Sequence, residues 1–373
     1  MRLIMESFIK NARKREIIHP QSDSFGYANI KIIGCGGAGN NTINRLMKIG
    51  IRGAKCIAIN TDCQHLDSVE AHIKILIGRN LTKGLGAGGN PEIGRAAAEE
   101  TREELTKTLR DSNLVFITCG EGGGTGTGSA PIIAEIAKLE GAIVVGVVTL
   151  PFNTEIGRID KAKTGLNLLK RYVDTLVVID NNRLLEIAPN LPIIEAFSVA
   201  DEVLATMVKG ITETISLPSL INLDFADVRT ILSTGGVAIV GVGESSGKEN
   251  RVVEAIDDAL NTPLLDVSID GAKGALIHIC GGNDMTLAEA NSVAKAISEK
   301  MDVNDSMVIW GARVSDEFDG LLRVMLLITG IKSPQIFGSG YSFNKSIYSS
   351  NMKKNSKIGL SDDIFNIGEI AFD

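Results

Sequence analysis

Short apolar runs alternate with amphipathic stretches through the first half of the chain. The runs are rich in isoleucine and valine and are four to six residues long, which is typical of strands buried on both faces of a parallel sheet. Strands are expected at residues 30–33, 56–59, 73–77, 114–119, 143–148 and 176–179. Helical patterns, such as the one at 92–109, separate most of these runs. The alternation predicts a doubly wound α/β fold with a parallel sheet.

A long amphipathic helix is predicted between Pro192 and Pro218, because apolar residues recur there every three or four positions. Beyond it, strand patterns at 237–240, 275–279, 307–310 and 321–328 bracket helical patterns at 251–260 and 287–301. We therefore expect a second, smaller α/β domain. The predicted division is an N-terminal α/β domain at 28–194, a central helix at 195–217 and a C-terminal α/β domain at 218–331.

The two ends of the chain differ from the part between them. Residues 1–27 combine helical spacing with a basic run and lack the long apolar core of a signal peptide. A flexible or docked leader is favoured there over a peripheral membrane helix. Residues 332–373 are dominated by Ser, Asn and Lys and end in the acidic and apolar peptide 362–373. This composition predicts a mobile linker and a short peptide that binds a partner.

The bulk composition narrows the class of protein. The chain has 373 residues, 44% apolar and 22% charged, which is ordinary for a soluble globular protein. A net charge of −7 argues against an extended nucleic-acid footprint. No apolar run reaches transmembrane length. The five cysteines form no CxxC pair, so they are interpreted as reduced thiols of a cytoplasmic protein.

A glycine-rich run after the strand at 114–119 carries the most chemical information. The run Gly122–Ser129 connects this strand to a predicted helix at 132–139, with Pro131 expected in its first turn. Free backbone N–H groups and the helix dipole meet at such a turn, which makes it an anion site. Its five glycines let the backbone approach phosphate oxygens, and Thr125, Thr127 and Ser129 are expected to add hydroxyl donors. The alternative is a plain glycine-rich surface turn.

Two further glycine loops lead into predicted helices. Gly34–Gly39 matches G-x-G-x-x-G, and with Asp62 downstream it also fits a nicotinamide-binding fold. The second loop, Gly84–Pro91, has no counterpart in that fold, which uses one glycine turn for one pyrophosphate. Three loops at one sheet edge favour a triphosphate held by backbone amides. The chain has no G-x-x-x-x-G-K-[ST] motif, so this is not a P-loop site.

The amino-acid sequences of these loops resemble those of a known family. GGGTGTGSAP, GCGGAGNN and the segment Asn222–Asp227 are similar to the tubulin superfamily, specifically to the archaeal form of its FtsZ cell-division GTPases. The likeness covers residues 28–330. It implies GTP and GDP as ligands with Mg²⁺, although no protein ligand for the metal is identifiable. It also implies head-to-tail polymerisation, a mid-cell division ring in the cytoplasm, and a membrane-tethering adaptor bound by the tail.

The resemblance also implies roles for individual residues. Phosphate-binding residues would be Gly36, Gly37, Ala38, Gly39, Asn40, Gly124, Thr125, Gly126, Thr127 and Gly128. The loop facing the γ-phosphate would be Gly86, Ala87, Gly88, Gly89 and Asn90. The remaining GTP contacts would be Glu155 at the ribose, Asn181 and Asp201 at the guanine edge, and Phe197 against the ring. The family has an arginine four residues after the ribose glutamate, whereas here Ile159 holds that position. A one-residue deletion would make Arg158 the corresponding GTP contact.

The catalytic prediction rests on the length of the long helix. Asp224 and Asp227 are the candidates to polarise an attacking water, with Asn222 assisting; the alternative for both is a helix cap or a solvated surface group. Asp201 lies near the start of the helix and Asp224 just beyond its end. About twenty helical residues at ~1.5 Å each span roughly 30 Å. If Asp201 binds guanine, the aspartates can reach only the nucleotide of a neighbouring molecule stacked head to tail, which makes an open filament.

Two other functions stay open at this stage. The first glycine motif leaves a nicotinamide-dependent oxidoreductase possible, which would change NADH fluorescence. A regulatory family member that binds GTP without hydrolysis is the other, and the presence of Asp224 and Asp227 argues against it.

Overall fold

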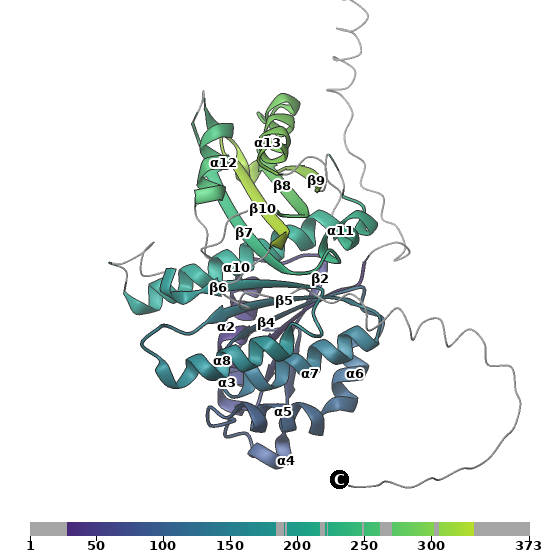
Figure 1. The fold of residues 1–373 in the computed structure, drawn as a ribbon, viewed down its shortest axis with the longest axis vertical. Helices are drawn as coiled ribbons and strands as arrows, with labels where there is room; N and C mark the ends of the chain where they lie inside the picture. Colours follow the sequence, from purple (N-terminus) through teal and green to yellow (C-terminus); the bar gives the residue numbers. More distant parts are fainter. Residues whose placement is uncertain are drawn as a thin grey trace, which may run out of the picture.

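One ten-stranded sheet runs through the part of the chain that the structure describes. A computed structural model describes residues 28–183, 190, 192–216, 221, 223–247, 250–261, 271–301 and 306–331. The strand order is β3-β2-β1-β4-β5-β6-β7-β10-β8-β9 (Figure 1). The expectations for the leader at 1–27 and the tail at 332–373 lie outside the described residues.

The first six strands are parallel and form the doubly wound sheet that the sequence predicts. They are β1 (Ile30–Cys35), β2 (Ala54–Asn60), β3 (Ile73–Leu76), β4 (Leu114–Gly120), β5 (Ile143–Leu150) and β6 (Thr175–Asp180). Every residue of β1 is buried, as the uninterrupted apolar runs require. The strand order reverses its direction between β1 and β4, whose ends are in register at Cys35 and Cys119. Ligands of open α/β sheets bind at such a switch point, outside the carboxyl ends of the strands.

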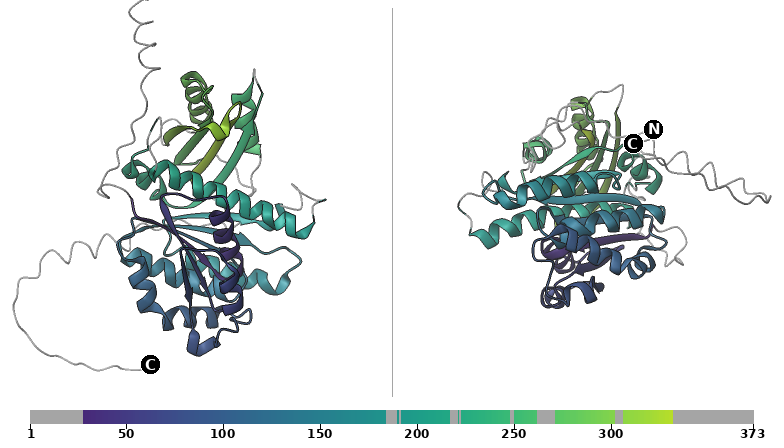
Figure 2. Two further views of the ribbon diagram at one scale, coloured as in Figure 1. Left: turned by 180° about the vertical axis from the view of Figure 1, so that it is seen from behind. Right: turned by 60° about the horizontal axis from the view of Figure 1, so that its bottom comes forward.

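Helices cover both faces of this parallel region. They are α2 (Gly36–Lys48), α3 (Cys63–Ser68), α4 (Arg79–Thr82), α5 (Pro91–Glu100), α6 (Arg102–Leu109), α7 (Thr125–Leu139) and α8 (Ile156–Leu169). Seen from behind, α2 lies against the long helix α10 (Ile193–Ser216) (Figure 2). The helix predicted between Pro192 and Pro218 is therefore present. No helix among the described residues is both long and apolar enough to span a membrane.

The second half of the chain continues the same sheet as a smaller α/β unit. Its elements are α11 (Phe225–Leu232), β7 (Val237–Ser245), α12 (Arg251–Asn261), β8 (Gly274–Gly281), α13 (Leu287–Lys300), β9 (Met307–Val314), the 3₁₀ turn η1 (Asp316–Phe318) and β10 (Leu322–Ile331). Only two residue pairs, Leu176 with Val237 and Val177 with Ala238, join β6 to β7. β10 is antiparallel to both β7 and β8. The predicted second α/β part is confirmed, whereas its boundary at residue 218 stays a prediction.

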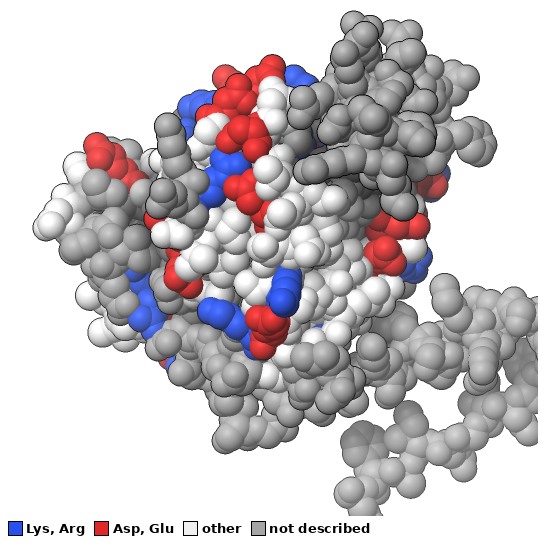
Figure 3. All heavy atoms as spheres, turned by 90° about the horizontal axis from the view of Figure 1, so that it is seen from above, with Lys and Arg blue, Asp and Glu red and all other residues white. Residues whose placement is uncertain are grey.

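Acidic and basic side chains are interspersed on the face seen in Figure 3, over the second half of the chain. No broad basic surface is visible there among the described residues. This is the mixed surface that a net charge of −7 and 22% charged residues lead one to expect.

Three local features differ from the sequence prediction. The helix expected at 92–109 is divided at Thr101, whose φ of −104° and ψ of 11° end α5 before α6 begins. Helix α7 begins at Thr125, six residues before Pro131, so the proline lies in the second turn. The short helix α11 is not among the elements predicted from the sequence; Asp224 caps it by accepting a 3.0 Å hydrogen bond from Ala226 N, which is the helix-cap alternative given for this residue.

Candidate nucleotide site

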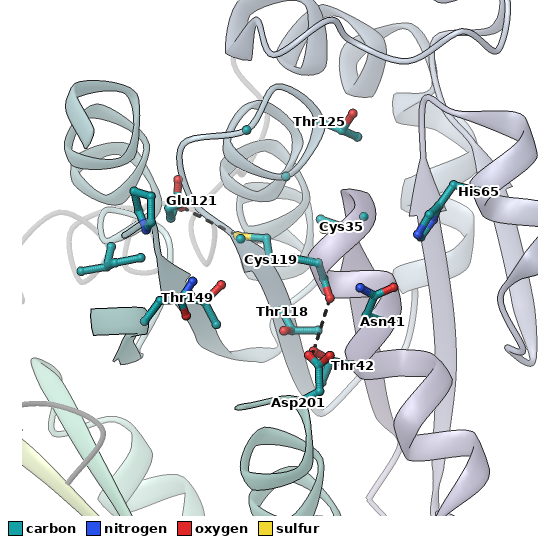
Figure 4. Close-up of a pocket in the computed structure, with 18 of the residues that line it drawn as sticks. Cys35, Asn41, Thr42, His65, Thr118, Cys119, Glu121, Thr125, Thr149 and Asp201 are labelled. Carbon is teal, nitrogen blue, oxygen red and sulfur yellow. Dashed lines mark hydrogen bonds between the residues drawn. The ribbon is translucent and has the colours of Figure 1, made fainter. Parts of the chain in front are cut away.

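A cavity of about 780 Å³ opens at the carboxyl ends of the parallel strands. Figure 4 shows that its walls come from α2, from the loop after β4, from the end of β5 and from α10. Nine of the residues predicted to bind GTP line it: Gly37, Ala38, Gly124, Thr125, Gly126, Glu155, Arg158, Asn181 and Asp201. These residues are spread over more than 160 positions in sequence, so the fold brings together what the motifs only suggested.

Two helices point their N-terminal ends at this cavity. Helix α2 begins at Gly36, directly after β1, and α7 begins at Thr125, four residues after Glu121. Gly36 has a φ of +70°, and a Cβ there would lie 2.9 Å from Gly126 N. Residues with a side chain rarely adopt this backbone conformation, so glycine is required at Gly36, where the turns that begin α2 and α7 meet. Unpaired N–H groups and two helix dipoles converge there, which is the arrangement that binds phosphate.

The glycines of the two loops have different functions. A Cβ on Gly37 would meet no atom within 4 Å, and Gly37 lines the cavity. A Cβ on Gly39 would lie 2.2 Å from Thr118 O, and one on Gly128 would lie 2.0 Å from Pro91 O. Gly39 and Gly128 thus let α2 approach β4 and α7 approach α5. Packing alone therefore requires glycine at these two positions; neither lines the cavity, and their contact with phosphate stays a prediction.

The hydroxyl groups of the glycine run are mostly used within the protein. Thr127 Oγ1 accepts a 2.8 Å hydrogen bond from Gly122 N, and Ser129 Oγ donates one of 2.7 Å to Thr125 O. Only Thr125 presents its side chain at the cavity wall, where its hydroxyl lies 2.6 Å from that of Thr61. Thr127 and Ser129 do not line the cavity, so donation by these two hydroxyls to a ligand stays a prediction.

The side chain of Asn40 has a structural role that the sequence did not reveal. It is fully buried and exchanges two 3.3 Å hydrogen bonds with the backbone of Ile59 in β2. Any contact of Asn40 with phosphate would have to come from its backbone. The next residues, Asn41 and Thr42, line the cavity instead. Their helical spacing from Gly37 and Ala38 was the signal that could have identified them.

The loop predicted to face the γ-phosphate lies beside the glycine run. Gly86 N donates to Thr61 O over 3.1 Å, and a Cβ on Gly124 would lie 2.8 Å from Asn90 N. Gly86, Gly88 and Gly89 all have positive φ. Lys161 of α8 donates a 2.7 Å hydrogen bond to Gly89 O. No residue of 86–90 lines the cavity itself, so its contact with a ligand stays a prediction.

Asp201 lies on the wall that α10 contributes. Thr42 Oγ1 donates a 3.1 Å hydrogen bond to its Oδ1, and burial raises the pKa of the carboxyl to about 6. Asn181, directly after β6, is also buried, and its Oδ1 has no hydrogen-bond partner. Asp201 thus keeps its second carboxylate oxygen for a ligand, and Asn181 lines the same cavity with an amide oxygen that has no partner in the protein. Phe197 is part of α10, but its side chain lies outside the described residues.

Glu155 and Arg158 form a pair at the mouth of the cavity. Their side chains make a 2.8 Å ion pair, and Glu155 Oε2 accepts a 3.0 Å hydrogen bond from Phe152 N. Arg158 also packs against the glycine run, because a Cβ on Gly122 would lie 2.8 Å from Arg158 Cβ. Arg158 thus lies at the cavity although its position in sequence departs from the family pattern; whether it contacts nucleotide stays a prediction.

Several cavity residues were not predicted from the sequence. They are Thr42, Asn44, Arg45, Lys48, His65, Thr118, Cys119, Gly120, Glu121, Thr149, Leu150, Pro151, Ser198 and Cys35. Burial raises the pKa of the Cys35 thiol to about 12, so this group stays neutral. Glu121 is also buried, and burial raises its pKa to about 7. Among the described residues, no cluster of three His, Cys, Asp or Glu side chains is placed to hold a metal ion.

The predicted catalytic aspartates lie away from the cavity. Asp224 and Asp227 are exposed at the start of α11, and neither lines the cavity. The far end of α11 is fixed to the first residue of β6, because Thr175 Oγ1 donates a 2.5 Å hydrogen bond to Leu232 O. Asn181 follows the last residue of β6, roughly 20 Å along the strand at ~3.3 Å per residue. Helix α11, which Asp224 caps and whose first turn holds Asp227, therefore lies toward the amino ends of the parallel strands, away from the cavity at their carboxyl ends (Figure 1). Asn222 lies outside the described residues.

Comparison with known proteins agrees with this architecture in both halves. The family model described as Tubulin/FtsZ family, GTPase domain, matches residues 29–189. The model of the FtsZ family, C-terminal domain, matches residues 236–332. Together they span the parallel region around the cavity and the smaller second part.

Individual relatives match over most of the chain. It is 56% identical over 341 residues to cell division protein FtsZ 2 of Methanocaldococcus jannaschii, covering 91% of this chain and 90% of that protein. It is 55% identical over 308 residues to cell division protein FtsZ 1 of Thermococcus kodakarensis, covering 82% of each. A solved empty FtsZ dimer from M. jannaschii matches with a TM-score of 0.78 and 50% identity, over 91% of this chain and 94% of that one. CetZ1 from Haloferax volcanii, at 23% identity and a TM-score of 0.72 over 83% of this chain and 96% of that one, shares the fold.

Proposed function

The chain belongs to the FtsZ family of GTPases, and from this premise we propose that it assembles head to tail into filaments that hydrolyse GTP between adjacent subunits. The resemblance drawn from the glycine loops is confirmed, and with it guanine-nucleotide binding. The nicotinamide-dependent alternative has no further support, because both halves match the GTPase family.

The proposed orientation of GTP follows from the chemistry of the cavity walls. The triphosphate would lie against the N-terminal ends of α2 and α7, where Gly37 and Thr125 line the cavity. The base would lie toward Asp201 and Asn181. An ionised carboxylate accepts hydrogen bonds from guanine N1–H and N2–H₂ together, and adenine offers no such pair of donors. Glu155 is proposed to accept from the ribose.

One observation carries the proposal of a shared active site. Asp201 lies in the cavity on the first half of α10, whereas Asp224 follows the end of that helix. From Asp201 to Ser216 the helix alone extends roughly 22 Å at ~1.5 Å per residue. Asp224 and Asp227 are therefore proposed to act on the nucleotide of the next subunit, where they would orient the attacking water with help from Asn222. A contact that joins two different surfaces of the same protein can repeat from subunit to subunit without closing into a ring, which gives a filament.

Mg²⁺ would neutralise charge that develops on the phosphoryl group. Because the described residues contain no cluster of metal-ligating side chains, phosphate oxygens and water would supply most of its coordination shell. The Thr125 hydroxyl on the cavity wall is one oxygen within the protein that fits such a shell. The backbone amides of the glycine run would stabilise the remaining charge.

The cellular role is proposed from the relatives. Two curated proteins more than 50% identical to this chain are named cell division proteins, so a cytoplasmic division ring at mid-cell is the proposed location. The tail at 332–373 is proposed to bind a membrane-tethering adaptor through its apolar end.

Sedimentation tests the assembly directly. With GTP and Mg²⁺, a large fraction of the protein should pellet at high speed above a critical concentration, and little should pellet with GDP. Pelleting that is equal with both nucleotides would refute the proposed function, because assembly would then not depend on the triphosphate.

A further inference from the structure

Glu121 is a buried acidic residue that directly precedes the glycine run Gly122–Ser129. It follows β4, its N–H donates to Thr149 O over 2.9 Å, and the residue is 4% exposed. It lines the cavity and, in Figure 4, lies on a different wall from Asp201. Neither the glycine motif nor the guanine site accounts for an acidic residue at this position.

The surroundings of the Glu121 carboxylate give it little stabilisation. Its Oε1 lies 3.8 Å from Cys119 Sγ, and its Oε2 has no hydrogen-bond partner. From α8, Gly165 packs so closely that a Cβ there would lie 2.3 Å from Oε2. Oε2 is thus buried against α8 and has no polar partner there.

No cation among the described residues forms an ion pair with Glu121. The titratable groups around it are the thiols of Cys119 in β4 and Cys35 in β1, and the guanidinium of Arg158 in α8. Both thiols stay neutral because burial raises their pKa, and Arg158 is paired with Glu155. From α7 and β5 the neighbours are the uncharged Thr127 and Thr149. Burial therefore dominates and raises the pKa of Glu121 to about 7, although Thr127 and Cys119 partly oppose the shift.

A bound triphosphate would place several negative charges next to this carboxylate. The amides expected to hold the phosphates include those of residues 124–126, which begin three residues after Glu121 and extend into the first turn of α7. Thr127 Oγ1, beside Glu121, also fixes the loop by accepting the hydrogen bond from Gly122 N. A negative charge at Glu121 would oppose the phosphates in a region with little water to screen it. A neutral carboxyl would not.

We propose that Glu121 is a positioning residue that makes nucleotide binding take up a proton: the site accepts the triphosphate with Glu121 neutral, and the proton comes from solvent. This rests on the proposed function, because it assumes that the phosphates lie on the glycine run. Above neutral pH the free protein holds an ionised Glu121, so GTP affinity should fall by up to roughly tenfold per pH unit. The effect is largest for the triphosphate and smaller for GDP, since fewer charges lie near the carboxylate.

Calorimetric titration of GTP into the full chain tests the proposal. At pH 8, binding is measured in buffers of different ionisation enthalpy, which gives the number of protons taken up. The wild type should take up close to one more proton than Glu121→Gln, a neutral variant of nearly the same shape. Glu135→Gln, a control in the second half of α7 whose residue pairs with Arg102, should match the wild type. Protons that the nucleotide itself exchanges are common to all three proteins and cancel.

The result distinguishes failure of the Glu121 proposal from failure of the proposed function. If GTP binds and the three proteins take up equal numbers of protons, the role of Glu121 is wrong while the proposed function stands. If none of them binds GTP, the proposed function fails first. Should Glu121→Gln not fold, infrared difference spectra of the wild type replace it: GTP added at pH 8 should produce the carbonyl stretch of one protonated carboxyl group. Absence of that band would overturn the proposal.

Discussion

Thr42 of α2 donates a 3.1 Å hydrogen bond to Asp201 of α10, so the first helix after β1 holds the carboxylate that faces the cavity from the long helix. This bond joins the helix that begins at the phosphate end of the site to the helix proposed to carry the base contact. It fixes one oxygen of Asp201 and leaves the other available for a ligand. Asp201 is therefore the residue on which base selectivity should depend.

Replacing Asp201 by Asn should weaken discrimination between GTP and ATP. The amide keeps an oxygen for Thr42 but loses the charge and one acceptor. A hydrogen bond to a charged group is worth about 1.5–3 kcal/mol, so the ratio of ATP to GTP dissociation constants should fall at least about tenfold. Glu202→Gln is the matched control, because Glu202 is adjacent but pairs with Arg45 and does not line the cavity. Equal ratios in Asp201→Asn and the wild type would contradict the base assignment.

GTP affinity should also fall on the acid side of neutrality. Burial raises the pKa of Asp201 to about 6 in the free protein. The ionised form is the one that accepts from guanine, so the contribution of Asp201 to affinity is full well above pH 6 and is lost as the pH falls through that value. The loss approaches roughly tenfold per pH unit below the pKa. Binding titrations from pH 5 to 8 should show this acid limb in the wild type; an equally steep limb in Asp201→Asn would mean that another group is responsible.

Two glycine substitutions should separate binding from folding. Gly37→Ala adds a methyl group where no protein atom lies within 4 Å, so thermal stability should hardly change while the methyl obstructs phosphate. Gly128→Ala places a methyl 2.0 Å from Pro91 O, and overpacking of this kind costs roughly 1–3 kcal/mol. Thermal melting and GTP titration of both variants check the distinction. The reverse pattern, with Gly37→Ala unstable and Gly128→Ala normal, would contradict the assigned roles.

The parallel strands could be predicted because the apolar runs that build a doubly wound sheet are continuous. The position of the nucleotide site could be predicted because the glycine loops follow those strands. Residues whose role depends on a distant neighbour could not. The sequence could not show that β2 binds the side chain of Asn40, or that α5 packs against Gly128 so closely that only glycine fits. Glu121 has no signal in sequence, since its environment is created by α8. Helical spacing from Ala38 could have placed Thr42 at the cavity, but not its hydrogen bond to Asp201 of α10.

Removing the tail should leave catalysis intact. Every residue that lines the cavity lies between Cys35 and Asp201, and Asp224 and Asp227 also precede the tail. Truncation after Gly340 should therefore keep GTP turnover within about twofold of the full chain in the same buffer. Loss of hydrolysis in the truncated protein would show that the tail contributes to the site or to assembly, contrary to its proposed role as a partner-binding peptide.

The shared-site proposal requires a variant that removes the charge of Asp224 without damaging α11. Asp224 caps this helix, and loss of a cap costs about 1 kcal/mol, so Asp224→Ala would confuse catalysis with stability. Asp224→Asn keeps a good capping residue and removes only the carboxylate. It should bind GTP normally and hydrolyse it orders of magnitude more slowly. Asp257→Asn, an exposed aspartate of α12, serves as the control and should hydrolyse GTP at the normal rate.

Mixing two inactive variants tests the central claim most directly. Asp224→Asn has an intact cavity, whereas Gly37→Glu places a carboxylate in the phosphate site and keeps Asp224. GTP hydrolysis is measured for each alone and for equimolar mixtures over a range of protein concentrations. If the site is completed between subunits, the mixture should regain activity that rises with concentration, because Asp224 of one chain serves the nucleotide of the other. If the mixture stays inactive while wild-type hydrolysis per molecule is independent of concentration, the catalytic carboxylate lies within a single chain and the account is contradicted.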